Sequence, residues 1–309
     1  MIAGLVMDGL SWAYYETRFE RDFYRKMGTE FQAFFCEIMK RGHPGDFTFP
    51  APWGTEGDLK NDGFLKSERT LFQAYAPERM EEKKTVDKIE KDFNGALKHW
   101  KGRFDKWVFV HNRRSGLPPK AVSKIIELNE AQPDIEVCEW GCPEVHQRLS
   151  KLSPPDLLSL FGEVPSRRTS RRVSFNKLRK IISSLSRQKP SPDQDLSPPS
   201  SEKLDANGLS DKVRVLLKAG MSLSAQVGRL FKQHYDPNLG DEIAQAFKEE
   251  YKRLRKTEDD PDQIFQGLQE FVGGLARGEP EYEVTVLAIL AYFFEQCDIF
   301  ENPPTEGTS

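Results

Sequence analysis

Two carboxylates and one amide in a short stretch of the chain have the residue types and spacing of a site for a hard cation. Asp58 and Asp62 fall in the run Gly-Asp-Leu-Lys-Asn-Asp-Gly, and Gln73 follows in Phe-Gln-Ala-Tyr. Oxygen ligands of these kinds suit Mg²⁺ or Mn²⁺, with water molecules and phosphate oxygens completing the coordination. Such an ion activates water and stabilises a phosphodiester under attack. The chemistry these residues predict is metal-dependent phosphodiester hydrolysis.

The period of the apolar residues places these side chains on two neighbouring strands. Residues 59–65 and 70–75 read as short strands joined by the polar turn Lys66–Arg69, which predicts a hairpin. We expect its two arms to bring the carboxylates and the amide towards a common point. The same residues also suit a simple tight turn, because Asp-Gly and Gly-Asp pairs are ordinary in hairpins.

The patterns around this hairpin predict an α/β domain. Apolar residues at helical spacing indicate helices over 12–40, 78–100, 118–129 and 143–152, and Gly28 interrupts the first of these either as a break or as a close-packing point. Short apolar runs indicate strands over 47–49, 106–111 and 134–140. The alternation of strand and helix after residue 100 predicts a parallel pair with its crossover helix.

This order of elements, αβββαβαβα, together with Asp-Gly on the second strand and Phe-Gln-x-Tyr on the third, resembles the restriction-endonuclease-like (PD-(D/E)XK) superfamily, especially its Mrr-like branch. The resemblance covers roughly residues 12–160. It implies a Mg²⁺-dependent nuclease with an acid on the second strand and Glu or Gln, one residue and Lys on the third. Asp62 matches the acid best, Asp58 is the neighbouring candidate, and Gln73 matches the Glu/Gln position.

The chain departs from that pattern at the lysine position, where Tyr75 stands. Lys60 or Lys66 could supply the ammonium group from another strand, since a lysine side chain is long and flexible. We take Lys60 as the stand-in. The resemblance thus implies a catalytic set of Asp58, Asp62, Gln73 and Lys60, with the metal held by the first three.

A basic stretch and then a linker follow the α/β domain, which we place at residues 1–162. Within residues 163–207 a run of basic residues lacks any acidic one, and it begins with Arg167, Arg168, Arg171 and Arg172. A phosphate backbone is a plausible partner for these four arginines, and a solvated tether is the alternative. Residues 189–207, rich in Pro and Ser, read as linker.

The last part, residues 208–303, predicts an all-α domain. Four helical patterns occupy residues 211–231, 240–254, 262–276 and 282–300, and the last is apolar on nearly every side. This domain, ending in Cys-Asp-Ile-Phe-Glu, resembles the C-terminal domains of bacterial ABC-three-component systems, which are related to Lamassu antiphage defence. The resemblance implies docking to an ABC/SMC-type ATPase and to a middle-component protein.

Composition restricts the classes of protein further. The 309 residues carry a formal net charge of −3, so DNA binding would have to come from local patches. Four cysteines in so long a chain indicate a reducing compartment. Residues 1–15 lack the features of a signal peptide, and the apolar run 284–294 is too short to span a bilayer. We expect a cytoplasmic protein without membrane contact, and a homo-oligomer is compatible with the sequence.

Two other groups of residues give weaker signals of a functional site. Cys138, Cys142 and His146 have spacing seen in zinc sites, but a fourth ligand is missing nearby. His111, which precedes Asn112-Arg113-Arg114, could contact phosphate or simply end a strand.

Two hypotheses follow from the sequence. The first is a Mg²⁺-dependent DNA endonuclease that serves as effector of an antiphage complex. The second is a nuclease fold that has lost its lysine and acts as a DNA-binding or subunit-bridging module.

Overall fold

The computed structural model describes residues 7–49, 61–164, 181–182, 201–234, 236–273, 280–296 and 299–300. The chain divides into two compact units, Phe19–Asp156 and a second unit made of Met1–Arg18 with Leu157–Ser309. The first is the α/β unit and the second is the helical unit. Residues 165–180 and 183–200, which hold most of the expected basic stretch and linker, lie outside the described residues.

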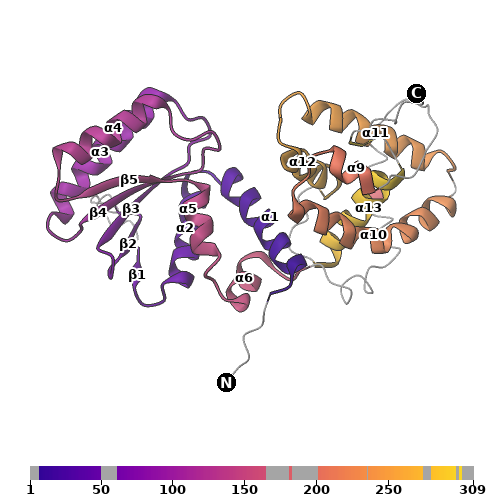
Figure 1. The fold of residues 1–309 in the computed structure, drawn as a ribbon, viewed down its shortest axis with the longest axis horizontal. Coiled ribbons are helices and arrows are strands. Elements are labelled where there is room, and N and C mark those ends of the chain that lie inside the picture. The colour runs from indigo at the N-terminus through magenta and orange to yellow at the C-terminus, as the bar shows by residue number, and fades with distance from the viewer. Residues whose placement is uncertain are drawn as a thin grey trace, which may run out of the picture. The chain divides into compact units, whose positions relative to one another are not determined.

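A mixed five-stranded sheet forms the centre of the α/β unit (Figure 1). Its strands lie in chain order: β1 (Phe47–Thr48), β2 (Gly63–Leu65), β3 (Thr70–Tyr75), β4 (Lys106–His111) and β5 (Glu136–Trp140). The first three strands pair antiparallel, and β4 runs parallel to both β3 and β5. The expected hairpin and parallel pair are therefore present.

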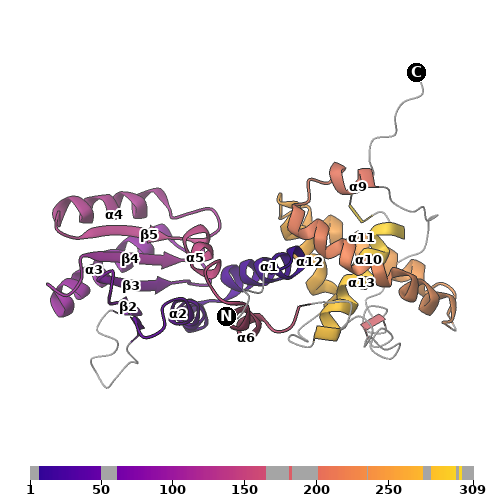
Figure 2. The same ribbon diagram turned by 60° about the horizontal axis from the view of Figure 1, so that its bottom comes forward.

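Two helical layers cover the sheet. Helices α3 (Glu82–Trp100) and α4 (Pro119–Ala131) lie on one face, while α2 (Gly28–Gly42) and α5 (Cys142–Leu149) lie on the other (Figures 1 and 2). On the first face Trp107 and Phe109 of β4 pack in a buried cluster with Phe93 of α3. On the second face Phe72 of β3 contacts Phe35 of α2. The sheet is therefore buried on both faces by apolar contacts with helices.

The first helical pattern forms two helices, α1 (Gly9–Arg25) and α2, and not one. Gly28 has φ +53°, a left-handed conformation that glycine adopts without steric cost. Its N–H donates to the carbonyl of Ala76, 2.7 Å away, directly after β3. Gly28 is therefore the break, and the new helix direction is fixed by a hydrogen bond to the end of the strand.

The helical unit contains α9 (Ser201–Ala206), α10 (Asp211–Lys232), α11 (Leu239–Leu254), α12 (Pro261–Gly273) and α13 (Pro280–Gln296). Helix α6 (Pro154–Phe161) and α1 each cross the division between the units. Described residues of α13 are buried almost throughout, as its apolar sequence predicts. Residues 201–206 form a helix where the sequence suggested linker, because Leu204 and the aliphatic part of Lys203 are buried.

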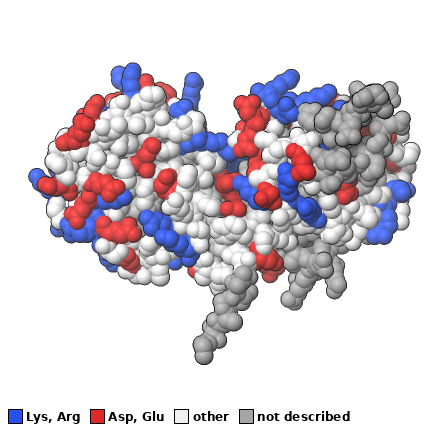
Figure 3. Space-filling view, viewed as in Figure 1, with Lys and Arg blue, Asp and Glu red and all other residues white. Residues whose placement is uncertain are grey.

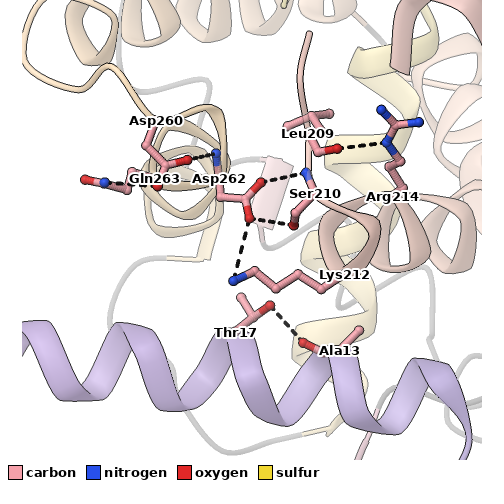
Figure 4. Close-up of polar contacts among 9 residues, drawn as sticks. All are labelled: Ala13, Thr17, Leu209, Ser210, Lys212, Arg214, Asp260, Asp262 and Gln263. Atoms are coloured by element: carbon pink, nitrogen blue, oxygen red, sulfur yellow. Dashed lines mark hydrogen bonds and ion pairs between the residues drawn. The ribbon is translucent and has the colours of Figure 1, made fainter. Parts of the chain in front are cut away.

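Polar contacts fix the ends of these helices. The Asp262 carboxylate of α12 accepts hydrogen bonds from Ser210 N at 3.0 Å and Ser210 Oγ at 2.5 Å, and Lys212 Nζ lies 3.6 Å from it (Figure 4). This carboxylate therefore anchors the start of α10. Arg18 of α1 forms a 2.5 Å ion pair with Glu283 of α13, which ties the first helix of the unit to its last.

Helix α10 lies very close to α13 at Gly220. A Cβ atom placed there would lie 2.2 Å from the main-chain oxygen of Leu287. At Gly228, two turns later, it would meet only a ring carbon of Tyr292 at 3.2 Å, a side chain that can shift. Glycine at position 220 therefore sets the distance between the two helices.

We predict that Gly220→Ala destabilises the helical unit by about 1–3 kcal/mol, because backbone cannot move aside as a side chain can. Urea unfolding followed by circular dichroism measures this change. Gly228→Ala is the matched control and should change the free energy of unfolding by less than about 1 kcal/mol, helped by the higher helix propensity of alanine. Equal effects of the two variants would contradict the close-packing assignment.

Candidate functional site

Most of the residues with the predicted chemistry lie at one edge of the sheet, where its parallel strands end. The parallel strands β3, β4 and β5 end there at Tyr75, His111 and Trp140, and the antiparallel β2 begins there just after Asp62. Open α/β sheets bind their ligands at the carboxyl ends of parallel strands. This edge, which we call the carboxyl edge, is therefore the place to look for a site.

Asp62 lies at the carboxyl edge, almost fully buried, and its carboxylate is surrounded by N–H donors. Oδ1 accepts a 2.6 Å hydrogen bond from Gln32 Nε2 of α2, and Oδ2 accepts a 2.8 Å bond from the Ala74 N–H of β3. Gln73 Nε2 also donates to Oδ2. The main-chain N–H of Asp62 donates to Phe72 O at 3.0 Å. Asp62 thus joins β2, β3 and α2 at one point.

Gln73 is the second predicted residue at this point. Only 3% of it is exposed, and its amide nitrogen faces Asp62. Its Oε1 atom is buried with no hydrogen-bond partner among the described residues. A buried amide oxygen without a donor is costly, so the site has capacity for one more donor or for a cation.

Cys36 of α2 also contacts Asp62. Its thiol donates to the main-chain oxygen of Asp62 over 3.1 Å. Burial, followed by the nearby Asp62 charge, raises the pKa of this thiol to about 12. The thiol therefore stays protonated at neutral pH and remains a donor.

The glycine of the Asp-Gly pair, Gly63, lies in strand β2 against the ring of Phe47. A Cβ atom at Gly63 would lie 2.4 Å from the ring of Phe47, and that ring is held by contacts with Phe35 and Phe72. Gly63 belongs to strand β2 and pairs with Phe72. At this position the glycine allows an aromatic ring to lie against the strand and does not form a turn.

The donor set at Asp62 and Gln73 agrees in chemistry with a Mg²⁺ or Mn²⁺ site but supplies only part of one. One carboxylate and one unpaired amide oxygen are the hard ligands such ions take. Residues 50–60, and with them Asp58 and Lys60, lie outside the described residues. Among the side chains that the structure describes, no group of three His, Cys, Asp or Glu residues is arranged to hold a metal.

The expected lysine position is filled by an aromatic ring. Tyr75 is partly buried, and its ring centroid lies 5.7 Å from that of Phe109. Lys66 lies beyond the other end of β2, where its ammonium donates to Gly45 O. The Nζ atom of Lys88, on α3, lies 6.0 Å from the Tyr75 ring and 2.5 Å from the Asp92 carboxylate.

The zinc-like constellation does not assemble. Cys138, Cys142 and His146 are all described residues, and they do not form a metal-binding group. The ring of His146 packs on Phe19, 5.7 Å between centroids, and burial raises the pKa of Cys138 to about 11. His111 is buried at the end of β4, where its Nε2 lies 3.4 Å from Glu139 Oε2 and its Nδ1 accepts the N–H of Arg113.

The expected phosphate-binding arginines lie outside the described residues. They are Arg167, Arg168, Arg171 and Arg172. On the face of the α/β unit drawn in Figure 3, acidic and basic side chains are interspersed and neither sign dominates.

Sequence reasoning missed two parts of the carboxyl edge. Gln32 is one of several polar residues on its helix, of which most were expected to be solvated and one to face the hairpin, and it is the direct partner of Asp62. Arg114, in the loop after β4, lies over the ring of Tyr24 with its Cζ atom 3.9 Å from the ring centroid. Helical spacing could have placed Gln32 one turn before Cys36 on the same face, whereas nothing in the sequence pairs Arg114 with Tyr24.

The helical unit has a pocket of about 220 Å³. Tyr251, Ile264 and Phe300 form apolar walls, and Arg255, Glu258 and Asp259 supply charge. Ligand pockets for small molecules usually measure about 300–1,000 Å³, so this pocket suits one large side chain better than a cofactor. Phe300, from the terminal Cys-Asp-Ile-Phe-Glu motif, is buried against Tyr251 and Phe294.

Comparison with known proteins identifies the C-terminal part only. Residues 176–301 match the family model of C-terminal domain 10 of the ABC-three component (ABC-3C) systems. The match supports the expected link of this part to those systems and does not extend to the α/β unit. No curated protein and no solved structure matched the chain. In the described part of the chain, every helix is too short or too polar to cross a membrane.

We predict that Asp62→Asn destabilises the α/β unit by about 2–4 kcal/mol, because an amide would turn its NH₂ group towards N–H donors that now share a carboxylate. Urea unfolding followed by tryptophan fluorescence measures this, since Trp107 and Trp140 lie in the unit.

Asp46→Asn is the matched control. Asp46 also accepts two hydrogen bonds, from Ser67 N at 2.9 Å and Ser67 Oγ at 2.5 Å, but it is only partly buried. Its loss should cost less than about 1 kcal/mol. An Asp62→Asn variant as stable as this control would mean that the donors do not hold the carboxylate as described.

Proposed function

We propose that this protein is the DNA-cleaving effector of an ABC-three-component antiphage system. In this proposal the α/β unit is a Mg²⁺-dependent nuclease, and the helical unit brings it to an ABC/SMC-type ATPase and a middle component. The link of residues 176–301 to ABC-three component systems supports the second part. The position of Asp62 beside Gln73 at the carboxyl edge is the single observation that supports the first.

The metal would be held by Asp62 and by the Oε1 atom of Gln73, with Asp58 as a further carboxylate. The unpaired, buried Oε1 atom is the feature that a cation would satisfy. When bound, Mg²⁺ or Mn²⁺ would supply an activated water and would stabilise the charge on the phosphodiester. Lys60 is proposed as the stand-in ammonium.

The residues around Asp62 would orient its carboxylate and exclude water from it. Gln32 and the Ala74 N–H hold the carboxylate in place, so its orientation does not depend on a bound ligand. Burial of Asp62 and Gln73 keeps water from competing for their oxygens and strengthens electrostatic attraction to a cation.

A second function is favoured by a separate observation. The ring of Tyr75 packs on Phe109 at the place where a nuclease of this kind carries lysine. This arrangement suits a nuclease fold that binds DNA or bridges subunits without cutting. The two functions differ in metal dependence, which makes them separable by experiment.

We predict that the assembled complex cleaves plasmid or linear DNA in the presence of Mg²⁺ and that Asp62→Ala lowers the rate at least about 100-fold, because the carboxylate is the principal ligand. Asp46→Ala is the control, since that carboxylate hydrogen-bonds Ser67 in the turn beyond the far end of β2. Mn²⁺ binding by calorimetry gives a second readout and should be lost with Asp62→Ala alone.

Unfolding curves must accompany these assays, because the loss of Asp62 also affects stability. Equal cleavage by wild type and Asp62→Ala would remove the site assignment. DNA binding without cleavage or Mn²⁺ binding would favour the non-catalytic function.

We also predict which unit docks. Hydrogen exchange of the full chain, alone and with the purified ATPase and middle component, should show protection in residues 211–300 and none in α3 or α4. Backbone amides buried by a partner exchange more slowly. Protection confined to the α/β unit would contradict recruitment through the helical unit.

A further inference from the structure

The carboxyl edge carries a group of cations that the nuclease pattern does not use. Arg113 and Arg114 lie in the loop after β4, residues 112–117, which we call the exit loop. Lys26 lies between α1 and α2 at the same edge, where its main-chain oxygen accepts a 2.8 Å hydrogen bond from Asn112 Nδ2. Both arginines are exposed, and Lys26 is partly so.

Hydrogen bonds hold the exit loop in one arrangement. The Arg113 N–H donates to His111 Nδ1 over 3.2 Å, and the Gly116 N–H donates to Arg113 O over 3.3 Å. The neighbouring α1–α2 turn is in turn fixed to the end of β3 through Gly28 and Ala76. A preorganised loop loses little conformational entropy when it binds a ligand.

The two arginines are placed differently. The guanidinium of Arg114 lies over the Tyr24 ring, with its Cζ atom 3.9 Å from the ring centroid, a contact that restricts its position. The Nε atom of Arg113 donates to Ser115 Oγ at 2.9 Å, and no described carboxylate forms an ion pair with it. The guanidinium groups of Arg113 and Arg114 are planar sets of N–H donors held in place by these contacts, and such donors match phosphate oxygens.

Two carboxylates near the exit loop face protein groups. Glu144 accepts the Gly141 N–H at 2.8 Å, and Glu139 faces His111. The charge of Glu20 acts on Tyr24, whose pKa is raised chiefly by burial. Glu139 and Glu144 therefore face protein groups, while Arg113 is exposed.

We infer that the exit loop binds the phosphate backbone of duplex DNA, with Arg113 and Arg114 as contacts and Lys26 as additional charge. This rests on DNA as the ligand of the proposed function and adds the surface that receives it. Phosphate contacts of this kind position a duplex without reading its sequence. DNA held there would lie along the edge that contains Asp62.

The test measures binding of the full chain to a fluorescein-labelled DNA duplex by anisotropy, in EDTA, over a range of salt concentrations. The Arg113→Ala/Arg114→Ala double variant should bind at least roughly tenfold more weakly at low salt. The slope of log Kd against log salt should fall by about 2, since each phosphate that an arginine neutralises contributes about 0.9 to that slope.

A matched control removes the same charge from the opposite edge. Arg103 also lies near an aromatic ring, with its Cζ atom 5.9 Å from the Trp100 centroid, and it precedes β4 together with Lys101. Lys101→Ala/Arg103→Ala should leave affinity and slope within about twofold of wild type, because these cations lie away from the proposed DNA path. Circular dichroism melting of each variant should match wild type, since all four side chains are exposed.

The outcomes separate this inference from the nuclease. Equal losses in the two double variants, or no loss in either, would overturn the exit-loop assignment whatever the cleavage result. Binding of an RNA duplex as tight as that of DNA would overturn DNA as the ligand. Binding that depends on Arg113 and Arg114 in a protein that never cuts DNA would support the inference and reject the nuclease.

Discussion

The Asp62 carboxylate is the interaction on which the organisation of the α/β unit depends. It receives N–H groups from a helix, from the side chain of the central strand and from the backbone of that strand. A buried carboxylate is stable only when such donors compensate for the lost water. These three donors are neutral amides, so they hold the carboxylate through hydrogen bonds and bring no positive charge of their own.

The sheet was predictable because its strands have strong apolar periods. Trp107 to Val110 form a buried run, and Thr70 to Tyr75 pair with it in parallel. The convergence of Asp62 and Gln73 followed from the hairpin, since residues of paired strands are brought opposite each other. The sequence does not decide whether α1 and α2 are separate, because a single glycine in a helical pattern can either continue the helix or end it.

Other features depend on contacts between distant segments and could not be read from local patterns. Gln32 approaches Asp62 only because Gly28 turns α2 onto the sheet. Helix α9 contacts the end of α13 through Lys203, whose Nζ donates to the Phe294 carbonyl 3.3 Å away. Stacking of Arg114 on Tyr24 joins the β4 exit to α1. Each of these pairs is separated by many residues that carry no signal of the contact.

Gly63, the second residue of the Asp-Gly pair, makes room for the ring of Phe47. Because Phe47 occupies the space where a side chain would stand, β1 is seated against β2 directly beside the carboxylate. The position of Asp62 therefore depends on the ring of Phe47, which belongs to a different strand. A side chain at position 63 would require a smaller residue at position 47. Substitutions at Phe47 and Gly63, which lie on different strands, would therefore have to occur together.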